Sequence, residues 1–216
     1  MINKEGFGII TITAALLAGL IILNSLINST FLFIVTVFFG FLFIFHFFFF
    51  RDPERTPPAE NNLIIAPADG KIIKIKKVRE DLYVKDEVQL VSIFMSVFNV
   101  HVNRIPISGR VELIKHKKGQ FMAAWADKAI EHNEQVIIGI HNDSYGKILF
   151  VQIAGLIARR IICNLKEGEQ VEKGKRFGLI KYGSRVDLYL PNHILLKVKV
   201  GDAVKAGRSI IGEFIA

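Results

Sequence analysis

The chain has 216 residues, a hydrophobic content of 51% and a formal net charge of +8. Cys163 is its only cysteine, so an intrachain disulfide is impossible and a reducing compartment fits. The apolar residues suffice for a real core, which excludes a small scaffold that depends on disulfides.

Two long apolar stretches occupy the N-terminal part of the chain. Residues 7–26 contain no charged residue, and residues 31–50 contain eleven phenylalanines with His46 as their only titratable group. As a helix, each stretch is about 30 Å long, which matches the hydrocarbon thickness of a bilayer. A secretory signal peptide would have one shorter apolar region, so residues 1–50 are predicted to form a transmembrane helical hairpin.

The basic residues that flank this hairpin predict its orientation. The connection at residues 27–30 is short and uncharged, whereas Lys4 precedes the first span and Arg51 and Arg55 follow the second. The positive-inside rule therefore places both ends at the cytoplasmic side of the cell membrane, together with everything that follows.

Residues 51–62 are rich in proline and charge and are predicted to be a linker. Residues 63–216 are predicted to form one mainly β domain, because short Val- and Ile-rich runs alternate with Gly, Asp, Asn and Pro. The predicted strands are 63–66, 71–77, 88–97, 110–116, 136–140, 147–153, 161–165 and 186–190, with a helix at 122–131.

A repeated pattern refines the fold class. Residues 168–174 and 201–207 both have the form G-x-x-V-x-x-G, 33 residues apart. Glycines permit tight turns, and the valine supplies one apolar anchor between polar faces. Such segments are typical of flattened β-sandwich, or barrel-sandwich-like, domains of the lipoyl and biotinyl type.

The pair Gly183-Ser184 offers distinctive chemistry just before the predicted strand at 186–190. A serine hydroxyl can attack the carbonyl of a preceding glycine, which has no side chain to shield it and accepts strained backbone angles. The amide then becomes an ester, and elimination leaves a pyruvoyl group in place of Ser184. A Gly-Ser pair alone is more often an ordinary turn.

Four segments in order resemble the phosphatidylserine decarboxylases in their short bacterial and archaeal form. They are Pro-Ala-Asp-Gly at 67–70, Met-Ser-Val-Phe-Asn-Val-His-Val-Asn-Arg at 95–104, Gly-Leu-Ile-Ala-Arg-Arg at 155–160 and Arg-Phe-Gly-Leu-Ile-Lys-Tyr-Gly-Ser-Arg-Val-Asp at 176–187. Three positions depart from the family's patterns. The long form has Leu-Gly-Ser-Thr where this chain has Tyr182-Gly183-Ser184-Arg185, the short form more usually has Phe at position 182, and Arg104 replaces the long form's second histidine.

The resemblance implies a self-cleaving proenzyme. Cleavage between Gly183 and Ser184 would give a large chain, 1–183, and a small chain, 184–216, that stay together as a heterodimer. The pyruvoyl group derived from Ser184 would form a Schiff base with phosphatidylserine and accept electrons as CO2 leaves, giving phosphatidylethanolamine in phospholipid biosynthesis. Neither pyridoxal phosphate nor a metal is required.

The resemblance also assigns roles to other residues. His101 is the expected proton-transfer group, since imidazole titrates nearest to neutral pH, although a histidine between two valines is otherwise often structural. Asp69 becomes a candidate acid that orients the base, although Ala-Asp-Gly is also an ordinary turn. With Arg104 at the second histidine position, the base for self-cleavage stays open.

Arg159 and Arg160 are candidates to bind the lipid phosphate. Adjacent residues of a strand point to opposite faces, so at most one of the two is expected to enter a pocket. The other basic residues are expected to lie on solvated faces near anionic lipid. The two spans and the absence of a recognisable nucleic-acid motif argue against a nucleic-acid partner.

Three alternatives to phosphatidylserine decarboxylation remain at this stage. The paired glycine motifs also suit a membrane-tethered biotinyl or lipoyl binding module, although Lys197 and Lys199 lie in an alternating strand pattern and fit it poorly. A zinc peptidase would need ligand pairs that the six histidines do not form. A related serine lipid such as archaetidylserine would present the same head group.

Overall fold

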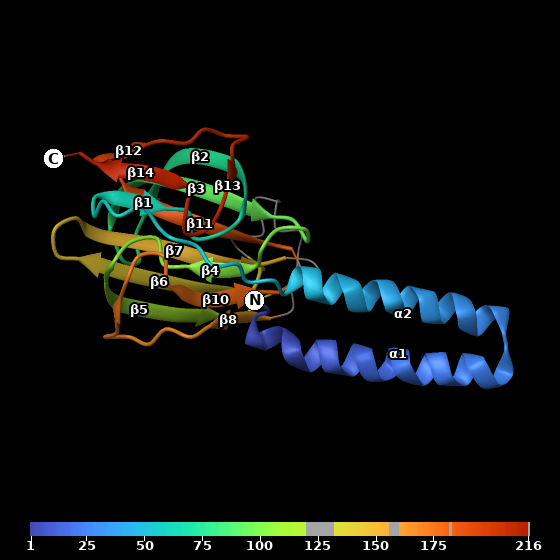
Figure 1. The fold of residues 1–216 in the computed structure, drawn as a ribbon. Coiled ribbons are helices and arrows are strands. Elements are labelled where there is room, and N and C mark those ends of the chain that lie inside the picture. Colours follow the sequence, from blue (N-terminus) through green and yellow to red (C-terminus); the bar gives the residue numbers. More distant parts are fainter. Residues whose placement is uncertain (120–131, 156–159, 182, 216) are drawn as a thin grey trace. The chain divides into compact units, whose positions relative to one another are not determined.

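The computed structural model describes residues 1–119, 132–155, 160–181 and 183–215 (Figure 1). The helix predicted at 122–131 lies outside the described residues. The chain divides into two compact units, Met1–Glu54 and Arg55–Ala216. Part of the predicted linker therefore belongs to each unit.

The first unit is a pair of antiparallel helices. A short 3-10 turn, η1 (Lys4–Gly6), leads into α1 (Phe7–Ile27), and α2 (Thr30–Phe49) follows. Asn28 ends α1 in the left-handed conformation, with φ of 49°. Thr13 Oγ1 lies 3.4 Å from His46 Nδ1, which joins the two helices across their interface. Both helices are long and apolar enough to cross a membrane, as predicted.

The ends of this helical pair are tied together by backbone pairing. The Asn3 amide donates to the Phe50 carbonyl at 2.8 Å, and the Asp52 amide donates to the Met1 carbonyl at 2.7 Å. The first of these bonds satisfies the carbonyl of Phe50, which caps the end of α2. The two helices therefore form a closed hairpin.

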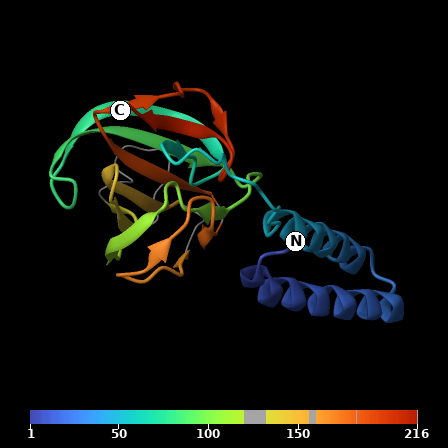
Figure 2. The same cartoon turned by 60° about the vertical axis from the view of Figure 1, so that its left-hand side comes forward.

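The second unit is built from antiparallel strands, which confirms the predicted mainly β domain. Eight strands form one sheet in the order β13-β2-β3-β11-β7-β6-β5-β9, and two three-stranded sheets have the orders β1-β14-β12 and β4-β10-β8. Figure 2 shows how the strands of this unit curl around its interior. The described strands are β1 (Leu63–Ile65), β2 (Gly70–Glu80), β3 (Asp86–Met95), β4 (Val102–Arg104), β5 (Gly109–Lys117), β6 (Gln135–Asn142), β7 (Gly146–Ala154), β8 (Ile161–Cys163), β9 (Gln170–Val171), β10 (Arg176–Ile180), β11 (Ser184–Pro191), β12 (Ile194–Leu196), β13 (Ala203–Val204) and β14 (Ile210–Phe214).

Alternation of side chains along the long strands creates the core. Val186, Leu188 and Leu190 of β11 are fully buried on one face of the sheet. Phe150 and Phe177 add an edge-to-face ring pair with centroids 5.4 Å apart. The core thus lies inside the curl of the eight-stranded sheet and beneath the two smaller sheets.

The β unit is an internal repeat with approximate two-fold symmetry. The order of the eight-stranded sheet is the same from either edge when β13, β2, β3 and β11 are matched with β9, β5, β6 and β7. The residue pairs between neighbouring strands match as well. The pair Val204–Gly70 corresponds to Val171–Gly109, the pair Ile72–Ile93 to Val111–Ile140, and the pair Met95–Ser184 to Asn142–Gly146. The register also shifts just after Ile72 in β2 and just after Val111 in β5.

The two G-x-x-V-x-x-G segments are equivalent parts of this repeat. Gly168 and Gly201 begin them with φ of 84° and 100°, and their amides donate to Val111 and Ile72 respectively. Positive φ is accessible to glycine at little cost, which explains the glycine at both positions. The sequence repeat is therefore also a structural repeat.

The first repeat consists of β1 to β3 and β11 to β14, and the second consists of β4 to β10. The second repeat is thus inserted into the first. The chain completes β1, β2 and β3, builds all of β4 to β10, and then returns to the first repeat at β11. In the second repeat, β6 and β7 are joined by a direct turn that ends at Gly146, whereas in the first repeat the equivalent position is Ser184. Gly183 and Ser184 thus lie where the chain returns from the second repeat to the first.

The eight predicted strands match β1, β2, β3, β5, β6, β7, β8 and β11. The strands β4, β9, β10, β12, β13 and β14 were not predicted. They have two to five residues each, and several contain charged residues or glycine. Such short runs carry little periodic pattern, and pairing with distant partners stabilises them instead.

Replacement of Phe177 by alanine tests this core. The ring is 1% exposed and packs on Phe150, so its loss should lower the free energy of unfolding by about 3–5 kcal/mol. Thermal or chemical unfolding of the full chain in detergent would measure this. Phe98→Ala is the control, because Phe98 is 67% exposed and its loss should change stability little. Equal losses in both variants would contradict this account of the core.

Candidate active site

Gly183 and Ser184 lie at the start of the central strand β11. Ser184 is fully buried and pairs with Met95 of β3 on one side and with Ala154 of β7 on the other. Gly183 has φ of 69°, a left-handed conformation that favours glycine over residues with a side chain. The bond predicted to be cut therefore joins a serine held by two neighbouring strands to a glycine in a left-handed conformation that other residues adopt only at a cost.

His101 contacts the peptide unit next to this bond. The Gly183 amide donates to His101 Nε2 at 3.3 Å, and His101 Nδ1 lies 2.9 Å from the Asn99 carbonyl oxygen. A carbonyl only accepts and an amide N–H only donates, so Nδ1 carries the proton and Nε2 carries the lone pair. The buried imidazole is thus neutral in this arrangement, with its basic nitrogen directed at Gly183.

A tight turn fixes the carbonyl that orients His101. The Asn99 side-chain oxygen accepts from the Ser96 amide at 2.9 Å and from the Ser96 hydroxyl at 2.8 Å. The Asn99 amide in turn donates to the Ser96 carbonyl at 3.0 Å. This turn, and not a carboxylate, supplies the described hydrogen-bond acceptor at Nδ1. Sequence reasoning missed it because the acceptor is a backbone atom.

The Ser184 hydroxyl contacts a sulfur atom in this conformation. Its Oγ donates to Met95 Sδ at 3.2 Å. Thioether sulfur is a weak acceptor, so rotation of the hydroxyl from this position costs little. Met95 is the first residue of the motif segment at 95–104, and the sequence alone gave no role for its side chain.

Asp69 is buried and engaged by other groups. Its carboxylate forms a two-point ion pair with Arg55, with Arg55 Nη2 at 2.8 Å, and accepts from the Ala206 amide at 2.8 Å. These contacts tie residue 55, at the start of the β unit, to the turn before β2. No hydrogen bond among the described residues joins Asp69 to His101, so its orienting role stays a prediction.

Arg104, at the second histidine position, also has an identified partner. Its Nη1 donates to the Gly174 carbonyl at 2.9 Å, and its aliphatic stem fills the space beside Gly207. The side chain thus packs between the two turns that end the repeated glycine segments.

The structure describes one of the two arginines predicted to bind lipid phosphate. Arg159 lies outside the described residues. The side chain of Arg160 is exposed, and its carbonyl accepts from the Lys181 amide at 3.2 Å. The structure therefore brings His101, Gly183 and Ser184 together, and phosphate binding stays a prediction.

A buried ion pair occupies the other face of β11, directly beside the serine. Arg185 and Asp187 are both fully buried, and Arg185 Nε and Nη2 donate to the Asp187 carboxylate at 2.6 and 2.8 Å. Arg185 Nη2 also donates to Ser92 Oγ at 2.8 Å. Burial raises the pKa of the Asp187 carboxyl above its ordinary value, and the adjacent guanidinium opposes this rise.

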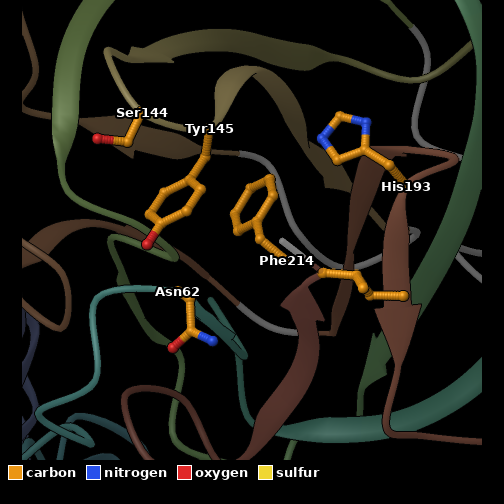
Figure 3. A pocket seen from close by; sticks show the side chains of 6 residues that line it. Asn62, Ser144, Tyr145, His193 and Phe214 are labelled. Atoms are coloured by element: carbon orange, nitrogen blue, oxygen red, sulfur yellow. The ribbon is translucent and has the colours of Figure 1, made fainter.

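A cavity of about 520 Å³ lies at the other end of the sheet, near the turn before Gly146 (Figure 3). Asn62 and Phe214 in this cavity are joined by a backbone hydrogen bond, from the Phe214 amide to the Asn62 carbonyl, equivalent to the bond between Ile180 and His101. The cavity is thus the counterpart of the His101 region in the other repeat. The lining residues are Asn62, Ser144, Tyr145, His193, Phe214 and Ile215.

Comparison with known proteins gives consistent matches over most of the chain. A family model described as phosphatidylserine decarboxylase matches residues 42–212. A phosphatidylserine decarboxylase proenzyme of Chlorobium limicola is 49% identical over 178 residues, covering 82% of this chain and 83% of the relative. Proteins of the same name from Geobacter metallireducens and Desulfotalea psychrophila are 46% and 50% identical, covering 98% and 79% of this chain and 95% and 80% of the relatives.

Replacement of Asp187 by asparagine tests the buried ion pair. Arg185 would lose its counter-charge at a fully buried position, so stability should fall by about 3–5 kcal/mol. The pair Arg79 and Asp81 has the same spacing in sequence, but its side chains are 66% and 75% exposed. Asp81→Asn should therefore change stability by at most about 1 kcal/mol.

Unfolding of both variants should be measured in a Ser184→Ala background, so that only uncleaved chain is compared. A similar effect of the two substitutions would contradict the assignment of a desolvated ion pair beside Ser184.

Proposed function

Since the chain belongs to the phosphatidylserine decarboxylase family, we propose that it is a membrane-anchored proenzyme that cuts itself between Gly183 and Ser184. The mature enzyme then converts phosphatidylserine to phosphatidylethanolamine and CO2 in phospholipid synthesis. One observation carries the proposal. The lone pair of His101 Nε2 is directed at the Gly183 amide, next to a buried serine whose hydroxyl donates to the weak acceptor Met95 Sδ.

Self-cleavage requires a nucleophile, a base and a leaving group, and these residues supply them. Ser184 Oγ attacks the Gly183 carbonyl carbon, and His101 Nε2 takes the hydroxyl proton. The C–N bond breaks, the Ser184 nitrogen takes up the proton, and Gly183 is left as an ester of Ser184 Oγ. Loss of the α-proton of residue 184 expels the Gly183 carboxylate, and one water then releases ammonia and leaves a ketone.

The pyruvoyl group formed in this way would supply an electron sink for decarboxylation, a task that needs neither pyridoxal phosphate nor a metal. The surroundings of Ser184 suit such a group, because burial excludes water from the reacting centre. His101 is proposed to return a proton to the carbon that loses CO2. Asp69 remains the proposed acid that orients the base.

The two products, 1–183 and 184–216, are proposed to stay together as a heterodimer. The strand β11 pairs with β3 along residues 184–191 and with β7 along residues 184–189. β12, β13 and β14 also pair with β1 and β2 of the large chain or with one another. Cleavage therefore removes one covalent bond and leaves these hydrogen bonds in place.

The helical hairpin is proposed to anchor the enzyme, with the β unit on the cytoplasmic side. Its substrate is a lipid, so a tethered domain needs only to meet the head group at the interface. Arg159 and Arg160 are proposed to bind the lipid phosphate. The chemistry acts on the serine head group, so archaetidylserine remains the alternative substrate.

Ser184→Ala gives the most direct test. Wild-type protein should yield two chains by intact-mass measurement, the smaller one with a blocked pyruvoyl N-terminus. The Ser184→Ala variant should remain a single chain of about 24.3 kDa, the mass of the intact sequence. Ser144→Ala, in the cavity at the other end of the sheet, should cleave normally. An uncleaved, folded wild-type protein would overturn the proposal.

His101→Ala should slow self-cleavage by about 10²- to 10⁴-fold, the contribution expected of a positioned general base. The measurement is the fraction of cleaved chain over time after synthesis in the presence of detergent or lipid. His193→Ala is the matched control, because His193 lies in the equivalent region of the other repeat. Cleavage of the His101 variant at the wild-type rate would remove His101 from the self-cleavage step.

A further inference from the structure

A chain of buried polar side chains extends from Ser184 into the core. Ser184 Oγ donates to Met95 Sδ at 3.2 Å, and Asn103 Nδ2 lies 3.8 Å from the same sulfur. Gln152 Nε2 then donates to Asn103 Oδ1 at 2.8 Å. All four residues are fully buried, and they come from the strands β11, β3, β4 and β7.

Hydrogen bonding fixes the orientation of both amides. Asn103 Nδ2 also lies 3.4 Å from the Pro67 carbonyl, which can only accept, so the Asn103 oxygen is directed at Gln152. Gln152 must therefore present its nitrogen to Asn103 and its oxygen to the other side. Gln152 Oε1 is buried, and no partner for it is found among the described residues.

The other repeat shows that the fold does not need polar groups at these positions. Ile64 pairs with Gly212 just as Asn103 pairs with Gly178, so Ile64 is the counterpart of Asn103. Both side chains are fully buried.

The counterpart of Gln152 in the other repeat is found by matching β11 with β7. Val186 pairs with Ile93 and Ile148 pairs with Ile140, so β11 and β7 are equivalent, and Gln152 corresponds to Leu190, which is also fully buried. In the repeat that has no reactive serine, the apolar side chains of Ile64 and Leu190 therefore take the places of Asn103 and Gln152. A buried amide with an unpaired oxygen is unfavourable for stability, which points to a role other than packing.

We infer that Asn103 and Gln152 are positioning residues for self-cleavage. Together they hold Met95 Sδ against the Ser184 hydroxyl, which keeps this hydroxyl in one rotamer next to Gly183 without binding it tightly. Sulfur is a weak acceptor, so the hydroxyl can turn to the Gly183 carbonyl at little cost. This inference rests on the proposed cleavage at Gly183-Ser184.

The experiment exchanges the amides for the residues of the other repeat, as Asn103→Ile, Gln152→Leu and the double variant. Each should slow self-cleavage at least tenfold, and the double variant should be no slower than the slower single variant, because the two amides act as one unit. Gln89→Leu is the matched control. Gln89 also donates through its amide, at 2.8 Å to the Ile194 carbonyl, but it pairs with Leu190 at the far end of β11. It should cleave at the wild-type rate.

Two further readouts separate positioning from structural damage. In a Ser184→Ala background, the unfolding temperature of the double variant Asn103→Ile/Gln152→Leu should be equal to or above that of Ser184→Ala alone, because both partners of the buried hydrogen bond are replaced together. Hydroxylamine, which cuts esters, should release no Gly183 hydroxamate from the slow variants, because their defect precedes ester formation. The inference would be overturned if the self-cleavage rates of the Asn103 and Gln152 variants fell in proportion to their stability. It would also be overturned if these variants accumulated the ester or cleaved at the wild-type rate.

The wild-type protein, measured in parallel, tests the underlying function separately. Its cleavage into two chains supports cleavage at Gly183-Ser184 whatever the variants do, whereas its failure to cleave would overturn both proposals.

Discussion

The position of β11 between β3 and β7 is the constraint on which the site depends. Ser184 is the first residue of this strand, and backbone pairing on both sides fixes where its Cα and Cβ lie. The serine can therefore be reactive without being mobile, since only its hydroxyl has to turn. The same two ladders explain how a small C-terminal chain could stay in place after the bond before it is cut.

The internal repeat separates what the fold requires from what the chemistry requires. Both ends of the sheet have the same registers and the same backbone hydrogen bonds, yet one end has His101 and Ser184 where the other has Asn62 and Gly146. A duplicated framework is thus compatible with reactive groups at one end only. Function lies in a few side chains on a common frame, as is usual for folds that host many activities.

The sequence predicted the elements whose patterns are local and left out those that depend on distant partners. The two apolar helices and the long strands have clear periodicity, and the order of motif segments was specific enough to suggest the cleaved bond. The Asn99 carbonyl that orients His101, and the Arg55 that engages Asp69, had no such pattern, because these contacts exist only once the chain has folded. Gln152 did leave a trace, as the single amide within the apolar run at 148–154.

Alternation along β11 explains how a reactive residue and a charged pair can share one short segment. Ser184 and Val186 face the core, whereas Arg185 and Asp187 face the other side of the sheet, where they bond to each other and Arg185 Nη2 also donates to Ser92 Oγ. Strand ends fray most readily, and a cut at Gly183 would turn residue 184 into such an end. Arg185 opposes fraying at this point, because its Nη2 donates to Ser92 Oγ and so joins the start of β11 to β3. Burial of the Arg185–Asp187 pair is costly, and the benefit is a fixed position for the group that has to react.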